Sequence, residues 1–366
     1  MSIFQSRVKR VQDYIKNTEL DLLLVVGREN LIYFTGLTQI ECMAILIPKE
    51  GEACAVTLWL DAGYVQQESG IKTYGYVFPK ENLASKVVKC IKNYGMNKPV
   101  IGFERYFVDF AMYDEMRKAF PEAYFTAAGD IFYKIRSVKD EQEINYIKQA
   151  ANAVCCGVEA AVKAIKPGVT ELELLAEAEY AMIKAGSAGS PFRPQIVSGD
   201  RTLLTHPCSS DRKINSGEIV VIHLGATYRG YCAKMCRTVA LGQIPREQEQ
   251  VYELLLEAQQ RAIDELKPGV TADSVDRAAR EIIEKAGYQR YYLDYVGYGV
   301  GLRQSEFYPI IGKGRNEVIE AGMVVDLLLP TIYLRGIGGP RVTDVIHVGE
   351  KTNEILTDYP RELIRL

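Results

Sequence analysis

Ile165-Lys166-Pro167-Gly168-Val169-Thr170 recurs 101 residues later as Leu266-Lys267-Pro268-Gly269-Val270-Thr271. Each copy opens a helical pattern that ends in Lys-Ala-Gly, at residues 184–186 and 285–287. The last Thr of each opening suits a helix N-cap, and the Gly of each ending suits a helix C-cap. Two matches at one offset predict a duplicated α/β half-domain, since the period is too long for a solenoid. Such a fold tends to place its ligand cleft between the halves.

The chain before this duplication alternates strand and helix patterns, which is typical of a sheet with helices packed on it. Apolar runs typical of strands occupy residues 20–26, 43–47, 53–59 and 100–103, and helical periodicity marks residues 4–16, 83–94 and 110–119. A helix start at Ser137–Glu141 opens the second part of the chain. We therefore expect an α/β chain of two domains, residues 1–136 and 137–366.

Composition excludes several classes of protein. The 366 residues carry a formal net charge of -3, so the basic excess of a nucleic-acid-binding protein is missing. No apolar run approaches the ~18 residues of a membrane span, and the polar start lacks the apolar stretch of a signal peptide. The eight cysteines form no CxxC pair, which favours reduced thiols and a cytoplasmic location. We expect neither a nucleic-acid partner nor a membrane partner.

Further motifs carry a specific resemblance. His206 opens an H-x-x-x-S-D-R block that ends at Arg212, and a series of glycine turns follows it. Together with the repeated Lys-Pro-Gly-Val-Thr, and with Tyr33-Phe34-Thr35-Gly36 as an early strand–turn signature, this pattern is similar to the pita-bread family of creatinase, prolidase and aminopeptidase P, peptidase M24. The resemblance covers essentially the whole chain. It implies a small N-terminal creatinase-like α/β domain, a C-terminal pseudo-symmetric pita-bread α+β domain, and a homodimer.

The resemblance also locates the positions of a metal site. The metallopeptidases of this family hold two divalent ions with two Asp, one His and two Glu. The matching positions of this chain carry none of these ligands; they are His223, Lys234, Tyr298, Leu328 and Thr343. A further His of the family is Ser305 here, whereas the adjacent Glu306 is kept. Because hard divalent ions require oxygen anions, we expect no metal ligands and no cofactor.

Three residues are candidates for catalysis. His206 matches the proton-shuttling His of creatinase, and its Thr-His-Pro context predicts a loop. Strand alternation places Lys234 and Cys236 on one face. Lys234 supplies a built-in cation in place of the metal, acts as a base or nucleophile with a lowered pKa, or pairs with an acid such as Asp326 or Glu306. Cys236 either is an activated thiolate or packs as a small buried side chain.

The candidates for substrate binding are His223, Tyr298, Asp326, Arg341 and Glu306. Asp326 lies two residues before the lost ligand position 328, and Arg341 lies two residues before position 343, so each faces the site. Lys234 and Arg341 would make the pocket positive and favour a carboxylate-bearing small molecule. The alternative is an ion pair between Arg341 and Asp326 that leaves no free charge.

These observations lead to three hypotheses about function. The first is a metal-independent, creatinase-like hydrolase that acts on a C–N bond of a small carboxylate-bearing molecule, with a character close to the creatinase and ectoine hydrolase branch. The second is a catalytically inactive pita-bread binding protein. The third is an Xaa-Pro dipeptidase or aminopeptidase.

Overall fold

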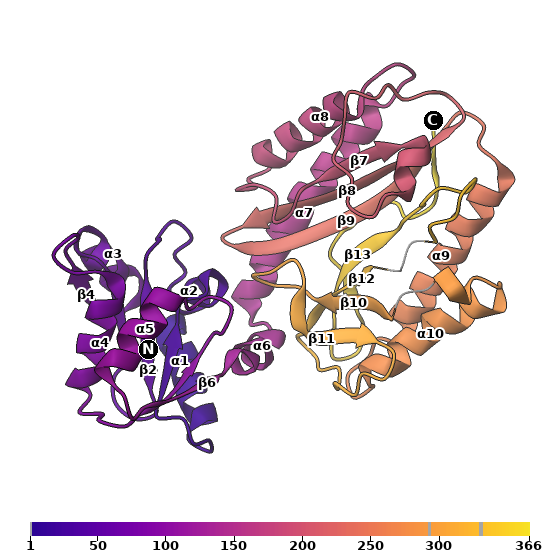
Figure 1. The fold of residues 1–366 in the computed structure, drawn as a ribbon. Helices are drawn as coiled ribbons and strands as arrows, with labels where there is room; N and C mark the ends of the chain where they lie inside the picture. The colour runs from indigo at the N-terminus through magenta and orange to yellow at the C-terminus, as the bar shows by residue number, and fades with distance from the viewer. Residues whose placement is uncertain (1, 292–293, 329–331) are drawn as a thin grey trace. The chain divides into compact units, whose positions relative to one another are not determined.

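The computed structural model describes residues 2–291, 294–328 and 332–366, apart from the side chain of Leu328. The chain forms two compact units, Met1–Ile135 and Arg136–Leu366 (Figure 1). Among the described helices, none is both long enough and apolar enough to cross a membrane. All eight cysteines are free thiols.

The N-terminal unit is a six-stranded mixed sheet with helices packed on it, as the alternating patterns predict. The strand order is β4-β3-β2-β1-β5-β6. Its strands are β1 (Leu22–Val25), β2 (Ala44–Pro48), β3 (Cys54–Leu58), β4 (Lys72–Tyr76), β5 (Val100–Phe103) and β6 (Tyr124–Ala127). Its helices are α1 (Ile3–Ile15), α2 (Arg28–Thr35), α3 (Trp59–Ser69), α4 (Leu83–Asn93) and α5 (Phe110–Ala119), and α6 (Gly129–Ser137) reaches the boundary.

One expectation in this unit is wrong. The stretch Tyr33–Gly36 is not a strand and turn, because Tyr33, Phe34 and Thr35 form the last turn of α2. Gly36 ends that helix in the left-handed region, with φ at 72° and its N–H on the carbonyl of Ile32. The residues before Gly36 are buried on the helix, and their apolar run suggested a strand. The glycine instead marks the C-cap of that helix.

The C-terminal unit is built on one large sheet in the order β11-β10-β12-β13-β9-β8-β7, antiparallel along this path, and β15 pairs parallel with β9. Its strands are β7 (Gln195–Ser198), β8 (Glu218–Tyr228), β9 (Tyr231–Leu241), β10 (Tyr295–Gly299), β11 (Glu306–Gly312), β12 (Val324–Leu328), β13 (Thr343–His347), and the short β14 (Glu354–Ile355) and β15 (Ile364–Arg365). Its helices are α7 (Glu141–Ala164), α8 (Glu171–Lys184), α9 (Arg246–Glu265) and α10 (Ala272–Lys285), with 3₁₀ turns η1 (Gly199–Leu203) and η2 (Gln289–Tyr291). Helices α7 and α8 pack against β7–β9, whereas α9 and α10 pack against the β10–β12 side (Figure 1).

The duplication extends to the backbone. Gly168 and Gly269 both have positive φ, at 88° and 91°, and their N–H groups donate to the carbonyls of Ile214 and Ile319. The next Thr of each loop caps its helix, with Thr170 accepting from the N–H of Glu173 in α8 and the matching Thr in α10 accepting from the N–H of Ser274. Each half therefore uses one Pro-Gly turn both to start a helix and to hydrogen-bond an equivalent segment of its own half. This equivalence confirms the predicted repeat.

A two-residue turn sets the register of the central strands. Strands β8 and β9 are joined by Arg229 and Gly230, both with positive φ, so the hairpin is of the type I′ kind that matches strand twist. This turn pairs Tyr228 with Tyr231, and the ladder then runs without a shift to His223 opposite Cys236. Because a slip of one residue would move every side chain to the other face, the turn determines which residues reach the candidate site.

A buried arginine holds this sheet to the end of the chain. The guanidinium of Arg237 on β9 is fully buried and pairs with Asp344 on β13 at 2.7 Å. It also donates to the carbonyls of Thr343, Tyr359 and Pro360, at 3.0, 2.9 and 2.8 Å. The carboxylate of Asp344 accepts further hydrogen bonds from Thr357 and from Gln259 of α9. The pair thus joins two strands, a helix and the C-terminal segment.

We predict that Asp344→Asn lowers the free energy of unfolding of the full chain by about 3–5 kcal/mol, because it leaves the Arg237 cation buried without its counter-ion. Chemical denaturation followed by far-UV circular dichroism measures the loss. Asp358→Asn, at an exposed position of the same C-terminal segment, is the matched control and should stay within about 0.5 kcal/mol of wild type. Equal stability of the two variants would contradict a structural role for this pair.

Candidate functional site

One row of register-paired residues crosses the C-terminal sheet. The ladder registers pair Gln195 with His223, His223 with Cys236, Cys236 with Thr343, and Thr343 with Leu328. Because residues directly opposite each other in antiparallel strands point to the same face, the first four side chains share a face, and the backbone of Leu328 continues the row on a fifth strand. The row contains three of the five positions that the resemblance assigns to metal ligands.

A second row lies two residues along the strands and contains Lys234, Asp326 and Tyr298. Asp326 and Tyr298 are register partners, and the backbone N–H of Tyr298 donates to Oδ1 of Asp326 at 2.6 Å. The ammonium of Lys234 forms an ion pair with Oδ2 of Asp326 and donates to the hydroxyl of Ser305 at 3.1 Å. The two rows gather the five assigned positions in one place, although each comes from a different strand of the sheet.

The Lys234–Asp326 ion pair is buried. The side chain of Asp326 is 0% exposed and that of Lys234 is 5% exposed. Burial raises the pKa of Asp326, while the Lys234 charge and the N–H of Tyr298 lower it and so favour the carboxylate. Of the alternatives for Lys234, the structure has the one in which an acid neutralises it. Lys234 is therefore not a free cation, and its catalytic role stays a prediction.

His223 is a neutral imidazole without a hydrogen-bonding partner. Both ring nitrogens are shielded from solvent and have no partner in the described ranges of the chain, and the ring centroid lies 4.9 Å from that of Phe192. Burial lowers the pKa of His223 to about 3, and the positive charges of Arg341, Lys234 and His206 act in the same direction. The side chain therefore offers one N–H donor and one acceptor nitrogen at neutral pH.

Arg341 is a buried cation whose hydrogen bonds go to neutral groups. Its guanidinium donates to the carbonyls of Leu204 at 2.9 Å and Thr202 at 3.3 Å, and to Oε1 of Gln195 at 3.4 Å. It also lies over the ring of Tyr333, 5.2 Å from the centroid. Within the described ranges no carboxylate forms an ion pair with it, so the alternative of a pair with Asp326 is wrong. Its Nε–H remains without a partner.

His206 lies on an exposed bend between η1 and β8, as its sequence context predicts. The loop is held by hydrogen bonds to the buried carboxylate of Glu171 on α8. That carboxylate accepts from the N–H of Ser198 at 2.9 Å and from the N–H of Ser210 at 3.0 Å, on either side of the loop. The carbonyl of His206 accepts from Arg193 at 3.0 Å. The catalytic role of His206 stays a prediction.

Two other candidate residues have surroundings that argue against their predicted roles. Cys236 is fully buried with Val197 and Val221, and burial raises the pKa of its thiol to about 12. That environment favours a packing thiol over a thiolate nucleophile. Glu306 is buried in an ion pair with Arg136, so its carboxylate is already neutralised within the fold.

The gathered side chains do not fit a pair of divalent ions. Such ions prefer several carboxylate oxygens, whereas the assigned positions carry the neutral His223, the paired Lys234, the phenol of Tyr298 and the hydroxyl of Thr343. The carboxylate of Asp326 is engaged by the ammonium. Over the part of the chain that the structure describes, no three His, Cys, Asp or Glu side chains form a group that could hold a metal ion.

Sequence reasoning missed several residues of the site. Phe192, Gln195 and Tyr333 contact its charged or polar groups, but each comes from a strand end or a loop outside the motifs. Ser305 was recognised only as a lost His, whereas in the structure it accepts from Lys234. Strand alternation offered a signal for Gln195, since it begins the apolar strand that pairs with β8.

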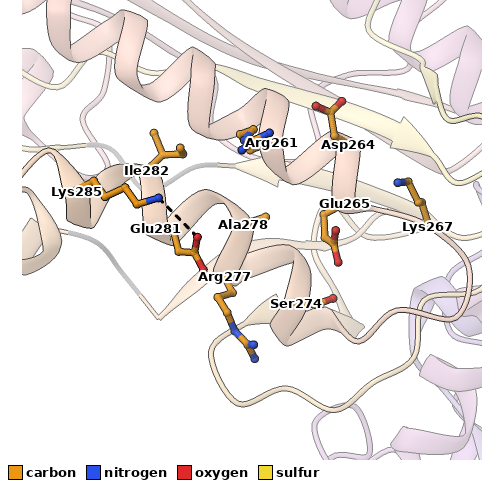
Figure 2. Close-up of a pocket in the computed structure, with 10 residues that line it drawn as sticks. All are labelled: Arg261, Asp264, Glu265, Lys267, Ser274, Arg277, Ala278, Glu281, Ile282 and Lys285. Carbon is orange, nitrogen blue, oxygen red and sulfur yellow. Dashed lines mark ion pairs between the residues drawn. The ribbon is translucent and has the colours of Figure 1, made fainter.

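A separate groove of about 440 Å³ lies between α9 and α10 (Figure 2). Its lining mixes basic residues such as Arg261 and Arg277 with acids such as Asp264 and Glu281, and Lys285 pairs with Glu281 at 4.0 Å. None of the site residues lines it. Since its charges of both signs are solvated side chains on helix surfaces, we treat it as a charged surface and not as part of the site.

Comparison with known proteins identifies relatives over the full length of the chain. Residues 145–350 match the family described as Metallopeptidase family M24, and residues 7–138 match the Creatinase/Prolidase N-terminal domain. The Xaa-Pro dipeptidase of Pyrococcus horikoshii is 32% identical over 100% of both chains. A solved Xaa-Pro dipeptidase from Bacillus anthracis has a TM-score of 0.92 at 30% identity, covering 99% of this chain and 100% of that one. An X-Pro aminopeptidase structure from Thermotoga maritima has a TM-score of 0.85 at 30% identity, covering 98% and 99%.

These relatives correct the leading hypothesis about function. They are named as Xaa-Pro dipeptidases and an X-Pro aminopeptidase within a metallopeptidase family, so the predicted place in a metal-free creatinase branch is wrong. The hypothesis of a metal-independent, creatinase-like hydrolase depended on that place in the family and is therefore wrong as well. At the coarser level the predictions agree with the relatives: the fold of both domains and a hydrolase family that acts on C–N bonds.

We predict that His223 makes the fold acid-sensitive. The folded state keeps the imidazole neutral down to a pKa of about 3, while the unfolded chain protonates it below 6.5. Unfolding therefore takes up a proton in this window, so the His223 contribution is complete above pH 6.5 and is lost as the pH falls toward 3. Between pH 7 and pH 5 it amounts to about 2 kcal/mol.

The measurement is urea denaturation of wild type and His223→Gln at both pH values. The variant should lose about 2 kcal/mol less stability than wild type on acidification. His206→Gln, at an exposed position, is the control and should keep the wild-type difference. The same loss in wild type and His223→Gln would refute a buried neutral imidazole.

We also predict that the Lys234–Asp326 pair is strongly coupled. Lys234→Met leaves the buried carboxylate without its cation and should cost about 3–5 kcal/mol of unfolding free energy. The double variant Lys234→Met/Asp326→Asn removes both charges and should recover at least half of that loss, because the substituted amide would still accept from the N–H of Tyr298. Lys285→Met, on the exposed face of α10, is the control. Additive losses in a double-mutant cycle would show that the two charges do not interact.

Proposed function

This chain belongs to metallopeptidase family M24, and we propose from that membership that it binds short peptides of the Xaa-Pro type without cleaving them by a two-metal route. The substrate class comes from the names of its full-length relatives. The absence of metal-dependent cleavage comes from the chemistry of its own residues. The chain would then act as a peptide-binding member of a hydrolase family.

The observation that carries this proposal is the buried Lys234–Asp326 ion pair. A divalent ion at these positions would meet an ammonium where the metallopeptidases offer a carboxylate, and like charges repel strongly in a desolvated site. The neighbouring positions add a neutral imidazole and a hydroxyl, which cannot balance two dications. Without bound metal, the activation of water that a metal supplies has no counterpart among these side chains.

Polar residues at the altered positions support binding over simple decay of the site. His223 and Tyr298 are polar replacements of metal ligands, the charge of Arg341 acts on His223, and the His206 loop is anchored by buried hydrogen bonds to Glu171. A few convergent polar groups on a rigid sheet are typical of a small-molecule site. The homodimer and the cytoplasmic location that the sequence led us to expect stay predictions.

The second candidate is Xaa-Pro dipeptidase activity itself. The observation that favours it is the similarity to Xaa-Pro dipeptidases across all of this chain. It requires a metal held by groups other than the five assigned positions.

One experiment separates the two candidates. Isothermal titration calorimetry with Ala-Pro should give saturable binding to the metal-free protein. Incubation of the same protein with Ala-Pro and either Mn²⁺, Co²⁺ or EDTA should release no proline, and elemental analysis should find no stoichiometric metal.

The Xaa-Pro dipeptidase of P. horikoshii, assayed beside it, is the positive control for proline release. Metal-stimulated turnover together with stoichiometric bound metal would overturn the binding proposal in favour of the dipeptidase. Absence of both binding and turnover would reject both candidates for this substrate class.

A further inference from the structure

Four buried polar atoms of the site have no hydrogen-bonding partner among the described residues. They are Nδ1 and Nε2 of His223, Nε of Arg341 and Oγ1 of Thr343. Folded proteins satisfy about nine-tenths of their buried polar groups, so several unpartnered atoms in one region of a sheet are unusual. Unpartnered donors grouped in this way indicate a ligand that accepts hydrogen bonds from them.

The three side chains belong to one region of the sheet. His223 and Thr343 are the two register neighbours of Cys236, so they lie on the same face, on β8 and β13 to either side of β9. Arg341 precedes Thr343 by two residues, and its charge acts on both His223 and Cys236. Its backbone N–H and carbonyl are held by the hydroxyl of Thr238 on β9, at 2.8 and 2.9 Å, which orients the residue toward the row.

The charge of the site determines the kind of ligand. Lys234 and Asp326 cancel each other within their ion pair, and His223 is neutral. Arg341 is 4% exposed and, among the described residues, has no acid as an ion-pair partner. A buried cation without a counter-ion is costly, so the missing partner carries a negative charge.

The geometry points to an anion-binding site formed by Arg341, His223 and Thr343, which takes the C-terminal carboxylate of a bound peptide. The available groups are the Nε–H of Arg341, the hydroxyl of Thr343 and one N–H of His223, and all three donate to anionic oxygens. This inference rests on the proposed function, since it names the group by which the peptide is held. Free phosphate offers the same chemistry and is the second source to be distinguished.

The residues around the four buried atoms are partly exposed. His223, Tyr298 and Tyr333 each keep some exposed surface, and His206 lies on an exposed bend. The apolar rings of Phe192 and Tyr333 lie against His223 and Arg341, so a bound anion would be held in surroundings of low polarity. Hydrogen bonds to an ion are stronger in such surroundings than in water.

The test compares ligands that differ only in the anion. Calorimetric titrations at pH 7.5 and constant ionic strength use Ala-Pro, its C-terminal amide Ala-prolinamide, acetate and inorganic phosphate. Ala-Pro should bind at least about tenfold more tightly than Ala-prolinamide, because the amide cannot accept charge-assisted hydrogen bonds from three donors. Arg341→Gln should remove this preference, and Arg341→Lys should restore part of it.

Thr343→Val provides a second variant that keeps the shape of the buried side chain, in case Arg341→Gln fails to fold. It should weaken Ala-Pro binding several-fold without changing the affinity for Ala-prolinamide. Arg277→Gln removes an exposed cation from α10 and is the matched control, with affinities within twofold of wild type. Far-UV circular dichroism of each variant reports its folding.

The outcomes separate this inference from the proposed function. Equal binding of Ala-Pro and Ala-prolinamide, unchanged in Thr343→Val, overturns the anion site and leaves peptide binding intact. Binding of phosphate or acetate that depends on Arg341, without binding of Ala-Pro, supports the anion site and overturns peptide binding. Failure of all four ligands to bind the folded wild-type protein overturns both.

Discussion

The buried ion pair between Lys234 and Asp326 is the constraint on which the candidate site depends. It joins β9 to β12 at the centre of the C-terminal sheet, and Asp326 also holds the backbone of Tyr298 on β10. A buried pair of this kind contributes little net stability over apolar residues, but it cannot be broken on one side without a large cost. Its presence therefore excludes any arrangement in which Lys234 is free to bind substrate or Asp326 is free to bind metal.

The duplicated architecture explains why such distant residues meet. Each half begins with the same Pro-Gly turn and helix cap, and each contributes strands to one sheet. The type I′ turn at Arg229 and Gly230 sets the register of the longest hairpin, and that register brings His223 opposite Cys236. The contact of Cys236 with Thr343, which lie more than a hundred positions apart in the chain, comes from the separate pairing of β9 with β13.

Much of the fold could be predicted from the sequence, because its signals are local. The repeat can be recognised directly in the amino-acid sequence. Strand alternation places Lys234 and Cys236 on the same face of their strand, whichever strand pairs with it. Partner choice is not local. Whether Lys234 would pair with Asp326 or Glu306 depended on the position of Arg136, which neutralises Glu306 from outside the motifs. Burial could not be predicted from the sequence either. Cys236 is a candidate nucleophile by sequence, but the structure buries it with Val197 and Val221. The branch of the family to which the chain belongs could be assigned only by comparison with relatives, because the loss of metal ligands alone suggested the metal-free enzymes.

A charge argument connects the lost metal site with the inferred anion site. The metallopeptidases of the family balance two dications with four carboxylates, so replacement of the ligands by neutral groups and a lysine leaves the surrounding arginine without acids. Asp326 cancels Lys234, while Arg341 forms no ion pair with any acid that the structure describes. If the site had only decayed, nothing would oppose the replacement of a buried cation by an apolar residue, since burial of an unpaired charge is unfavourable. Its retention beside an unpartnered imidazole and an unpartnered hydroxyl is accounted for by an anionic group that arrives with the ligand.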